Sequence, residues 1–263
     1  MQRKLLVWIG ALLVLGAAGG AYFYATRPAP PPPGAPTAPP PGASPPPPAA
    51  AAPIANPVPA TAGAPLPALD ESEAPLRAGL EELAGREALA ALLRPEDLVR
   101  HIVASVDALP RARLDMEVRP VRHPAGEFLA LGPDDGATLS PRNAERYEPY
   151  VRVLGALDMR RLAALYQRYY PLFQQAYRDL GNPDGYFNDR LVAVIDHLLA
   201  TPEVNGPIRL VRPKVMYEFA DPALQSLSVG QKTLLRLGPA QRRTVLAQLR
   251  ALRAAVASSS PAP

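Results

Sequence analysis

The globular part of this chain takes its fold from YPLFQQAYRDLGNPDGYFNDRLVAVIDHLL, residues 170–199. This stretch predicts two amphipathic helices that are joined by a tight turn. The first helix starts at a cap on Asp158 and ends at Gly181. The second starts at Asn188 or Asp189, because both side chains are good N-caps. Apolar residues recur at helical spacing on one side of each helix, so we expect both helices to pack against one core.

Similar helical patterns cover most of the chain from residue 70 to residue 257, and the last two helices meet at Gly238. The period changes around a Gly-Pro-Asp-Asp-Gly turn, where residues 127–131 and 137–139 predict a small hairpin. The segment 208–219 reads as extended. The predicted fold class is therefore mostly α, a compact multi-helix domain with a small β hairpin.

An uncharged apolar segment near the N-terminus, Leu5–Tyr24, predicts a single-pass transmembrane helix. Twenty residues form a helix of about 30 Å, which matches the bilayer core. Arg3 and Lys4 precede the segment, which favours a cytoplasmic N-terminus and an exported domain. These features predict an inner-membrane protein with a periplasmic domain. The alternative is a cleaved signal peptide with Leu5–Ala18 as its apolar core.

Proline dominates the next segment, residues 28–69, which contains no charged residue. Because proline lacks an N–H and fixes φ, this segment is predicted to be a disordered tether. The predicted division of the chain is therefore an anchor with its cytoplasmic end over 1–27, a linker over 28–69, a globular helical domain over 70–257, and a disordered tail over 258–263.

The charge balance of the domain argues against binding to nucleic acid. The chain has 28 lysines and arginines and 24 acidic residues, and all the acidic residues follow residue 69. Arg3, Lys4 and Arg27 account for most of the net charge of +4, so the domain itself is nearly neutral. A general nucleic-acid interface needs a basic footprint. The chain has no cysteine, so its stability must come from core burial rather than from disulfides.

The best candidate site is GNPDGYFNDR, residues 181–190, where turn residues, carboxylates, an amide and aromatic rings are close together. Asp184 and Asp189 could orient a ligand or bind a cation, and Tyr186 and Asn188 lie beside them. The spacing does not fit an EF-hand. The structural alternative is a helix corner in which Asn188 caps the second helix and the rings fix the turn.

A second candidate set lies on the helix that follows this turn. The spacing of Asp189, Asp196 and His197 places them on one side of a helix, where a carboxylate and an imidazole could form a general base or a metal site. One helix does not complete a metal shell, so no metal and no cofactor is predicted. The alternative is a solvated face on which His197 is bound by a neighbour.

The last helix is basic on one side. Arg242, Arg243, Arg250 and Arg253 fall within roughly 100° of one another, beside the apolar stripe of that helix. This pattern predicts contact with an anionic surface or an acidic partner. The alternative is a solvated face that pairs with acidic residues of the same domain.

Two long motifs identify a resemblance to a known family. YPLFQQAYRDLGNPDGYFNDRLVAVIDHLLATPE and PKVMYEFADPALQSLSVGQKTLLRLGP resemble the bacterial domain-of-unknown-function 3014 family, and the similarity spans about residues 68–255. The family has no assigned activity, so the resemblance transfers no catalytic residue. It implies an inner-membrane anchor and a periplasmic domain.

Together these observations predict a membrane-anchored periplasmic binding or scaffold module of the cell envelope, without catalysis. Its expected partners are the inner membrane, through Leu5–Tyr24, and an envelope protein or an anionic surface. The alternative is a periplasmic hydrolase that acts on an envelope polymer such as peptidoglycan, with Asp184 and Asp189 as its carboxylates. A hydrolase needs two converging ionisable groups in a pocket, whereas a scaffold needs an exposed binding surface.

Overall fold

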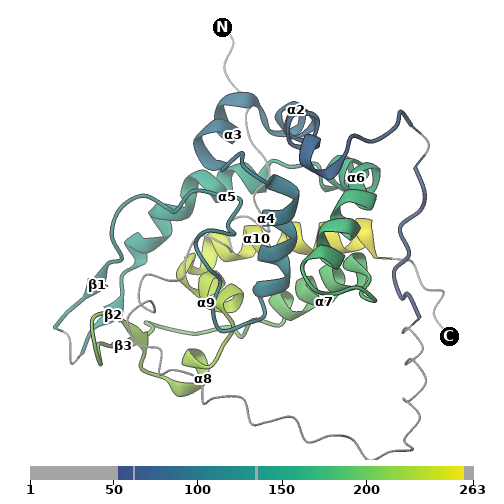
Figure 1. Cartoon of the computed structure of the whole chain (residues 1–263). Coiled ribbons are helices and arrows are strands. Elements are labelled where there is room, and N and C mark those ends of the chain that lie inside the picture. Colours follow the sequence, from purple (N-terminus) through teal and green to yellow (C-terminus); the bar gives the residue numbers. More distant parts are fainter. Residues whose placement is uncertain (1–52, 62, 134–135, 258–263) are drawn as a thin grey trace, which may run out of the picture.

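A computed structural model describes residues 53–61, 63–133 and 136–257 of the protein (Figure 1). This part of the chain is mostly helical, with two small hairpins. The elements, with η for a 3-10 helix, are η1 (Leu69–Glu71), α2 (Glu73–Ala84), α3 (Arg86–Leu92), α4 (Leu98–Ala108), β1 (Ala130–Leu131), β2 (Thr138–Leu139), η2 (Pro141–Tyr147), α5 (Glu148–Gly155), α6 (Met159–Asp179), α7 (Phe187–Leu199), β3 (Leu210–Val211), β4 (Glu218–Phe219), α8 (Pro222–Gln225), α9 (Val229–Arg236) and α10 (Gly238–Val256). The helical part of the predicted fold class and the small hairpin are therefore confirmed.

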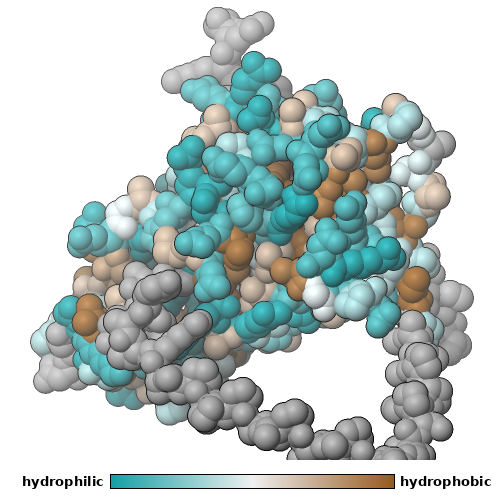
Figure 2. All heavy atoms as spheres, viewed as in Figure 1, coloured by the Kyte–Doolittle hydropathy of each residue, from teal (hydrophilic) through white to brown (hydrophobic). Residues whose placement is uncertain are grey.

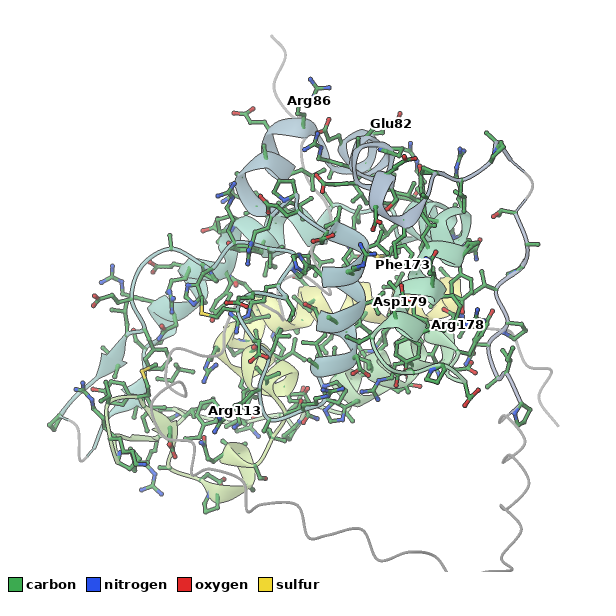
Figure 3. All side chains as sticks on the ribbon, in the orientation of Figure 1. Glu82, Arg86, Arg113, Phe173, Arg178 and Asp179 are labelled. Carbon is green, nitrogen blue, oxygen red and sulfur yellow. The ribbon has the colours of Figure 1, made fainter. Side chains whose placement is uncertain are left out.

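The core is built around α6 and α10. The Asp158 carboxylate accepts hydrogen bonds from the first backbone N–H groups of α6, as the sequence predicts. Helix α10 packs against α5, α6 and α7, and α4 packs against α6 and α7. Figure 3 labels Phe173 of α6, whose ring is buried, and Arg178 and Asp179 at the exposed end of that helix. The completely buried aliphatic side chains of this core include Leu154, Ile195, Leu198, Val245 and Leu249.

Helices α2 and α3 cover one end of this core, because Leu76 and Leu80 of α2 are buried against it. The visible face over α2, α3 and α4 is mostly hydrophilic, with smaller hydrophobic areas between the polar side chains (Figure 2). The apolar residues of these helices therefore lie mainly on their inner sides, as expected for amphipathic helices.

The two hairpins lie at the other end of the molecule (Figure 1). Strands β1 and β2 are antiparallel, with Ala130 opposite Leu139, and strands β3 and β4 form a second antiparallel pair. Both hairpins cover a small separate core of Ala137, Leu210, Phe219 and Leu235. The first hairpin lies within the segment predicted from the sequence. Two residues of its turn, 134 and 135, are outside the described residues.

The predicted membrane helix is corrected by the structure. Among residues 53–61, 63–133 and 136–257, no helix is both long enough and apolar enough to cross a membrane. The longest, α6, has 21 residues, but Arg160, Arg161 and Arg168 line its exposed side. The predicted anchor Leu5–Tyr24 lies outside the described residues. A single-pass inner-membrane protein with a periplasmic domain is therefore not supported, which corrects that part of the predicted fold class and localisation.

The predicted division of the chain also differs from the structure at one boundary. Residues 1–27, most of the predicted linker and the tail 258–263 lie outside the described residues. The last part of the linker is described, and residues 53–61 run along α6 and α7 (Figure 1). We call residues 53–61 the strap. The packed part of the chain thus begins upstream of residue 70.

Candidate functional site: the α6–α7 corner and its strap

The corner between α6 and α7 is built on stacked aromatic rings. Phe187, the first residue of α7, is 1% exposed, and its ring stacks on Phe173 of α6 with centroids 6.0 Å apart. The Tyr177 ring also packs against the Phe187 ring, tilted to it, with centroids 5.4 Å apart. The turn between the helices needs a left-handed residue, which Gly181 supplies with φ of +105°. The ring stack therefore fixes where α7 begins.

The sequence-based prediction for the start of α7 is wrong in one respect. Neither Asn188 nor Asp189 caps this helix, because the helix begins at Phe187 and Tyr186 is its N-cap residue. Gln174 of α6 takes over part of the capping. Its Oε1 accepts the Phe187 N–H at 2.8 Å, and its Nε2 donates to the Gly185 carbonyl at 2.7 Å. A side chain from a neighbouring helix thus satisfies a backbone donor that a local cap usually takes.

Asn188 is completely buried and uses its whole carboxamide to join three segments. Its Oδ1 accepts the Tyr166 hydroxyl of α6 at 3.1 Å. Its Nδ2 donates to the carbonyl of Val256, the last residue of α10, and to the carbonyl of Asn56 in the strap, both at 2.9 Å. Every polar atom of this side chain therefore has a partner, as a buried amide requires.

Asp189, in the first turn of α7, binds the backbone of the strap. Its Oδ2 accepts the Ala55 N–H at 3.0 Å, and its Oδ1 accepts the Asn56 N–H at 2.6 Å. The same Oδ1 accepts the Asn56 side-chain Nδ2 at 3.0 Å. A carboxylate at this position also benefits from the positive end of the α7 dipole. The Asp189 carboxylate therefore binds two successive backbone N–H groups and one side-chain carboxamide of the strap.

Two further contacts hold the strap. The Tyr186 hydroxyl accepts the Val58 N–H at 2.8 Å, and the Thr61 hydroxyl donates to the Gln167 carbonyl of α6 at 3.3 Å. Asn56 and Val58 are half-buried, and Val58 packs against the main core, whereas Pro57 between them is exposed. This alternation is typical of an extended peptide that lies along a surface.

Two tyrosines at the corner, Tyr166 and Tyr170, are held in their protonated form. Burial raises the pKa of Tyr166 well above its ordinary value, and the neighbouring Tyr170 and Tyr186 add to the shift. Burial also raises the pKa of Tyr170, and its hydrogen bond with Tyr186 contributes. These hydroxyls are therefore hydrogen-bond donors and acceptors at neutral pH, not bases.

The predicted carboxylate–imidazole set does not come together as a site. Asp196 forms a two-armed ion pair with Arg253 of α10, in which Arg253 Nη2 donates to Asp196 Oδ2 at 2.9 Å. His197 Nε2 lies 2.9 Å from the Ser228 hydroxyl at the start of α9. Asp189 instead faces the strap. Each side chain thus ties α7 to a different segment, and the described residues include no cluster of three or more metal ligands.

The remaining predicted residues lie on the surface. Asp184 is exposed in the turn and takes part in none of the hydrogen bonds to the strap described above. On α10, Arg243 and Arg250 are exposed, whereas the guanidinium of Arg242 donates to the Pro202 carbonyl at 3.2 Å. Because Arg253 pairs with Asp196, half of the predicted basic surface is engaged within the domain. Contact of this helix with an anionic surface stays a prediction.

A pocket of about 580 Å³ lies elsewhere, between β2, the segment 204–208 and the start of α10. Its lining is mostly apolar and includes Leu139, Ile208 and Leu237. Of the residues predicted from the sequence as site residues, Arg242 alone lines it. The pocket and the α6–α7 corner are therefore separate features.

Sequence reasoning missed three contributors to the corner: Gln174, the hydroxyls of Tyr166 and Tyr170, and the strap itself. The tyrosines read as an apolar stripe, because their helical spacing places them in the core. One signal for the strap was present. Asn56 is the single carboxamide in residues 28–69, and it lies between Ile54 and Val58. A polar residue among aliphatic ones in a proline-rich segment favours a specific contact.

The chain belongs to DUF3014, a family of proteins of unknown function, because the family match covers residues 98–253. The matched region runs from α4 into the last turn of α10 and includes the whole α6–α7 corner. The strap lies before it. Neither the curated proteins nor the solved structures contain a match to this chain.

Proposed function

We propose that this protein is a binding module whose α6–α7 corner binds an extended peptide segment through its backbone. The observation that supports the proposal is the strap itself. Asp189, Asn188 and Tyr186 engage three backbone N–H groups and one carbonyl within residues 55–58. Such main-chain contacts supply affinity, while the neighbouring side chains supply selectivity.

The chemistry of the corner favours binding over hydrolysis. Asp189 accepts two backbone N–H groups, so its carboxylate acts as a hydrogen-bond acceptor for a peptide. Asp184, the second carboxylate of the predicted hydrolase, is exposed in the turn and does not share these contacts. No observation favours the hydrolase as a second candidate. Binding at this corner does not depend on where the protein is located.

The test uses the full chain with its own strap released. Asn56→Asp places a carboxylate next to Asp189, and Val58→Asp places a charge at a half-buried apolar position, so the two changes together should free the corner. We call this double substitution the strap-released variant. A labelled peptide PIANPVPAT, acetylated and amidated, is then titrated onto it and followed by fluorescence anisotropy.

We expect saturable binding of this peptide to the strap-released variant. Adding Asp189→Ala should weaken binding at least about tenfold, because a charge-assisted hydrogen bond contributes about 1.5–3 kcal/mol. Adding Asp184→Ala is the matched control and should leave the affinity unchanged. Failure of the strap-released variant to bind the peptide, with cooperative unfolding retained, would refute the proposed function.

A further inference from the structure

We infer that the strap is an intramolecular competitor that keeps the corner closed to external peptides, and that the external ligand carries an Asn-Pro pair followed by an aliphatic residue. This inference rests on the proposed function and adds its ligand class and its regulation. The strap occupies the corner with the chemistry that a ligand would use. Residues 55–58, Ala-Asn-Pro-Val, therefore serve as the template for that ligand.

Each position of the template has a physical role. The Asn56 carboxamide donates to Asp189 Oδ1 at 3.0 Å, so the site binds a side chain of the peptide as well as its backbone. Pro57 follows, exposed and without an N–H that would need a partner, and it favours an extended conformation of the residue before it. Val58 packs on the core, which selects an aliphatic side chain there. Proline also lowers the entropy cost of binding.

The strap can leave without unfolding the domain. Apart from the partly buried Val58, its contacts are hydrogen bonds near the surface, several of them exposed or half-buried. Among the described residues, Leu69 in η1 is the next buried residue along the chain, and it fixes the domain end of the connection. About ten residues of connecting chain keep a released strap close to the corner, at an effective concentration of about millimolar.

An external peptide can replace the contact that release of the strap removes. The Asn188 Nδ2 donates to both the Val256 carbonyl and the Asn56 carbonyl. Release of the strap removes the Asn56 carbonyl and admits water to this donor, and the carbonyl of an incoming peptide would restore the direct hydrogen bond. The corner can therefore exchange its own strap for an external peptide.

The experiment compares three full-length proteins with the same labelled peptide, PIANPVPAT. They are the unchanged chain, the strap-released variant and a matched control with Ile54→Asp and Ala60→Asp, which adds the same charge at two exposed strap positions. We expect the unchanged chain and the control to bind at least about tenfold more weakly than the strap-released variant, because their own strap competes at its effective concentration. A peptide with Asn→Asp at the second template position should bind at least about tenfold more weakly than PIANPVPAT.

The outcomes separate the two proposals. Equal affinity of the unchanged chain and the strap-released variant would overturn the competition while leaving peptide binding in place. Absence of binding by both would refute the proposed function as well. A concentration-dependent dimer of the unchanged chain, lost in the strap-released variant, would place the strap in the corner of a second copy and overturn the intramolecular assignment. Equal binding of the Asn→Asp peptide would overturn the ligand class.

Discussion

Replacing Asn188 by alanine should destabilise the domain by about 2–4 kcal/mol. The substitution removes three hydrogen bonds, to the Tyr166 hydroxyl and to the carbonyls of Asn56 and Val256. Each such bond contributes about 0.5–1.5 kcal/mol net, and partners left buried without one cost more. An ordinary helix cap, the role predicted from the sequence, would cost about 1 kcal/mol. The magnitude therefore distinguishes a buried junction from a cap.

Urea unfolding of the full chain, followed by circular dichroism, measures this free energy. Asp184→Ala is the control from the same corner, and we expect it to change the free energy of unfolding by less than about 0.5 kcal/mol, as for an exposed residue. Hydrogen exchange of the Asn56 N–H should also quicken in the Asn188 variant, because the strap loses its bond to the Asn188 side chain and is held less firmly against Asp189. A loss of about 1 kcal/mol or less for Asn188→Ala would refute the view that this side chain joins α6, α10 and the strap.

Three further predictions concern the same region. Phe187→Ala should cost about 3–5 kcal/mol in urea unfolding, because the ring is 1% exposed, whereas Leu180→Ala, with 45% exposure, should cost less than about 1 kcal/mol. Arg190→Ala should cost about 2–3 kcal/mol, because the buried Asp107 carboxylate loses its charge-assisted hydrogen bond of 2.8 Å to Arg190 and keeps its ion pair with Arg111, and a loss below about 0.5 kcal/mol in the same assay would contradict this. Burial, with a smaller contribution from Arg190, lowers the pKa of His197 below its ordinary 6.5, so the unfolded chain binds the proton more readily. The melting temperature should therefore fall as the pH drops through about 6.5, less steeply in a His197→Gln variant; equal slopes would contradict this.

Local patterns were sufficient for much of the helical fold. The Asp158 cap, the helix that follows it and the meeting of the last two helices at Gly238 all agree with the structure. These features depend on residues that are close in sequence, because capping and amphipathic spacing act within a few turns. The same holds for the hairpin at β1 and β2, whose turn residues lie between its strands.

The start of α7 was placed wrongly because its determinant is not local. Asn188 and Asp189 have the residue types of good caps, but the ring of Phe187 stacks on Phe173, and Gln174 accepts the Phe187 N–H. Burial of an aromatic ring outweighs the roughly 1 kcal/mol of a cap. The prediction of a membrane helix rested on residues 5–24, which lie outside the described residues. Among the described residues, no helix is both long enough and apolar enough to span a membrane.

By itself the sequence determined the family, the helical class and the segment, residues 181–190, at which the α6–α7 corner lies. Only the tertiary structure decided what those residues do. Asp189, Asp196 and His197 lie on the same helix but have different partners. Asp196 binds Arg253, and His197 binds Ser228. Asp189 binds the strap, which lies more than a hundred residues upstream. Periodicity specifies which side chains share a helix face, but the partner on that face is set by long-range packing, which brings distant segments within hydrogen-bond distance.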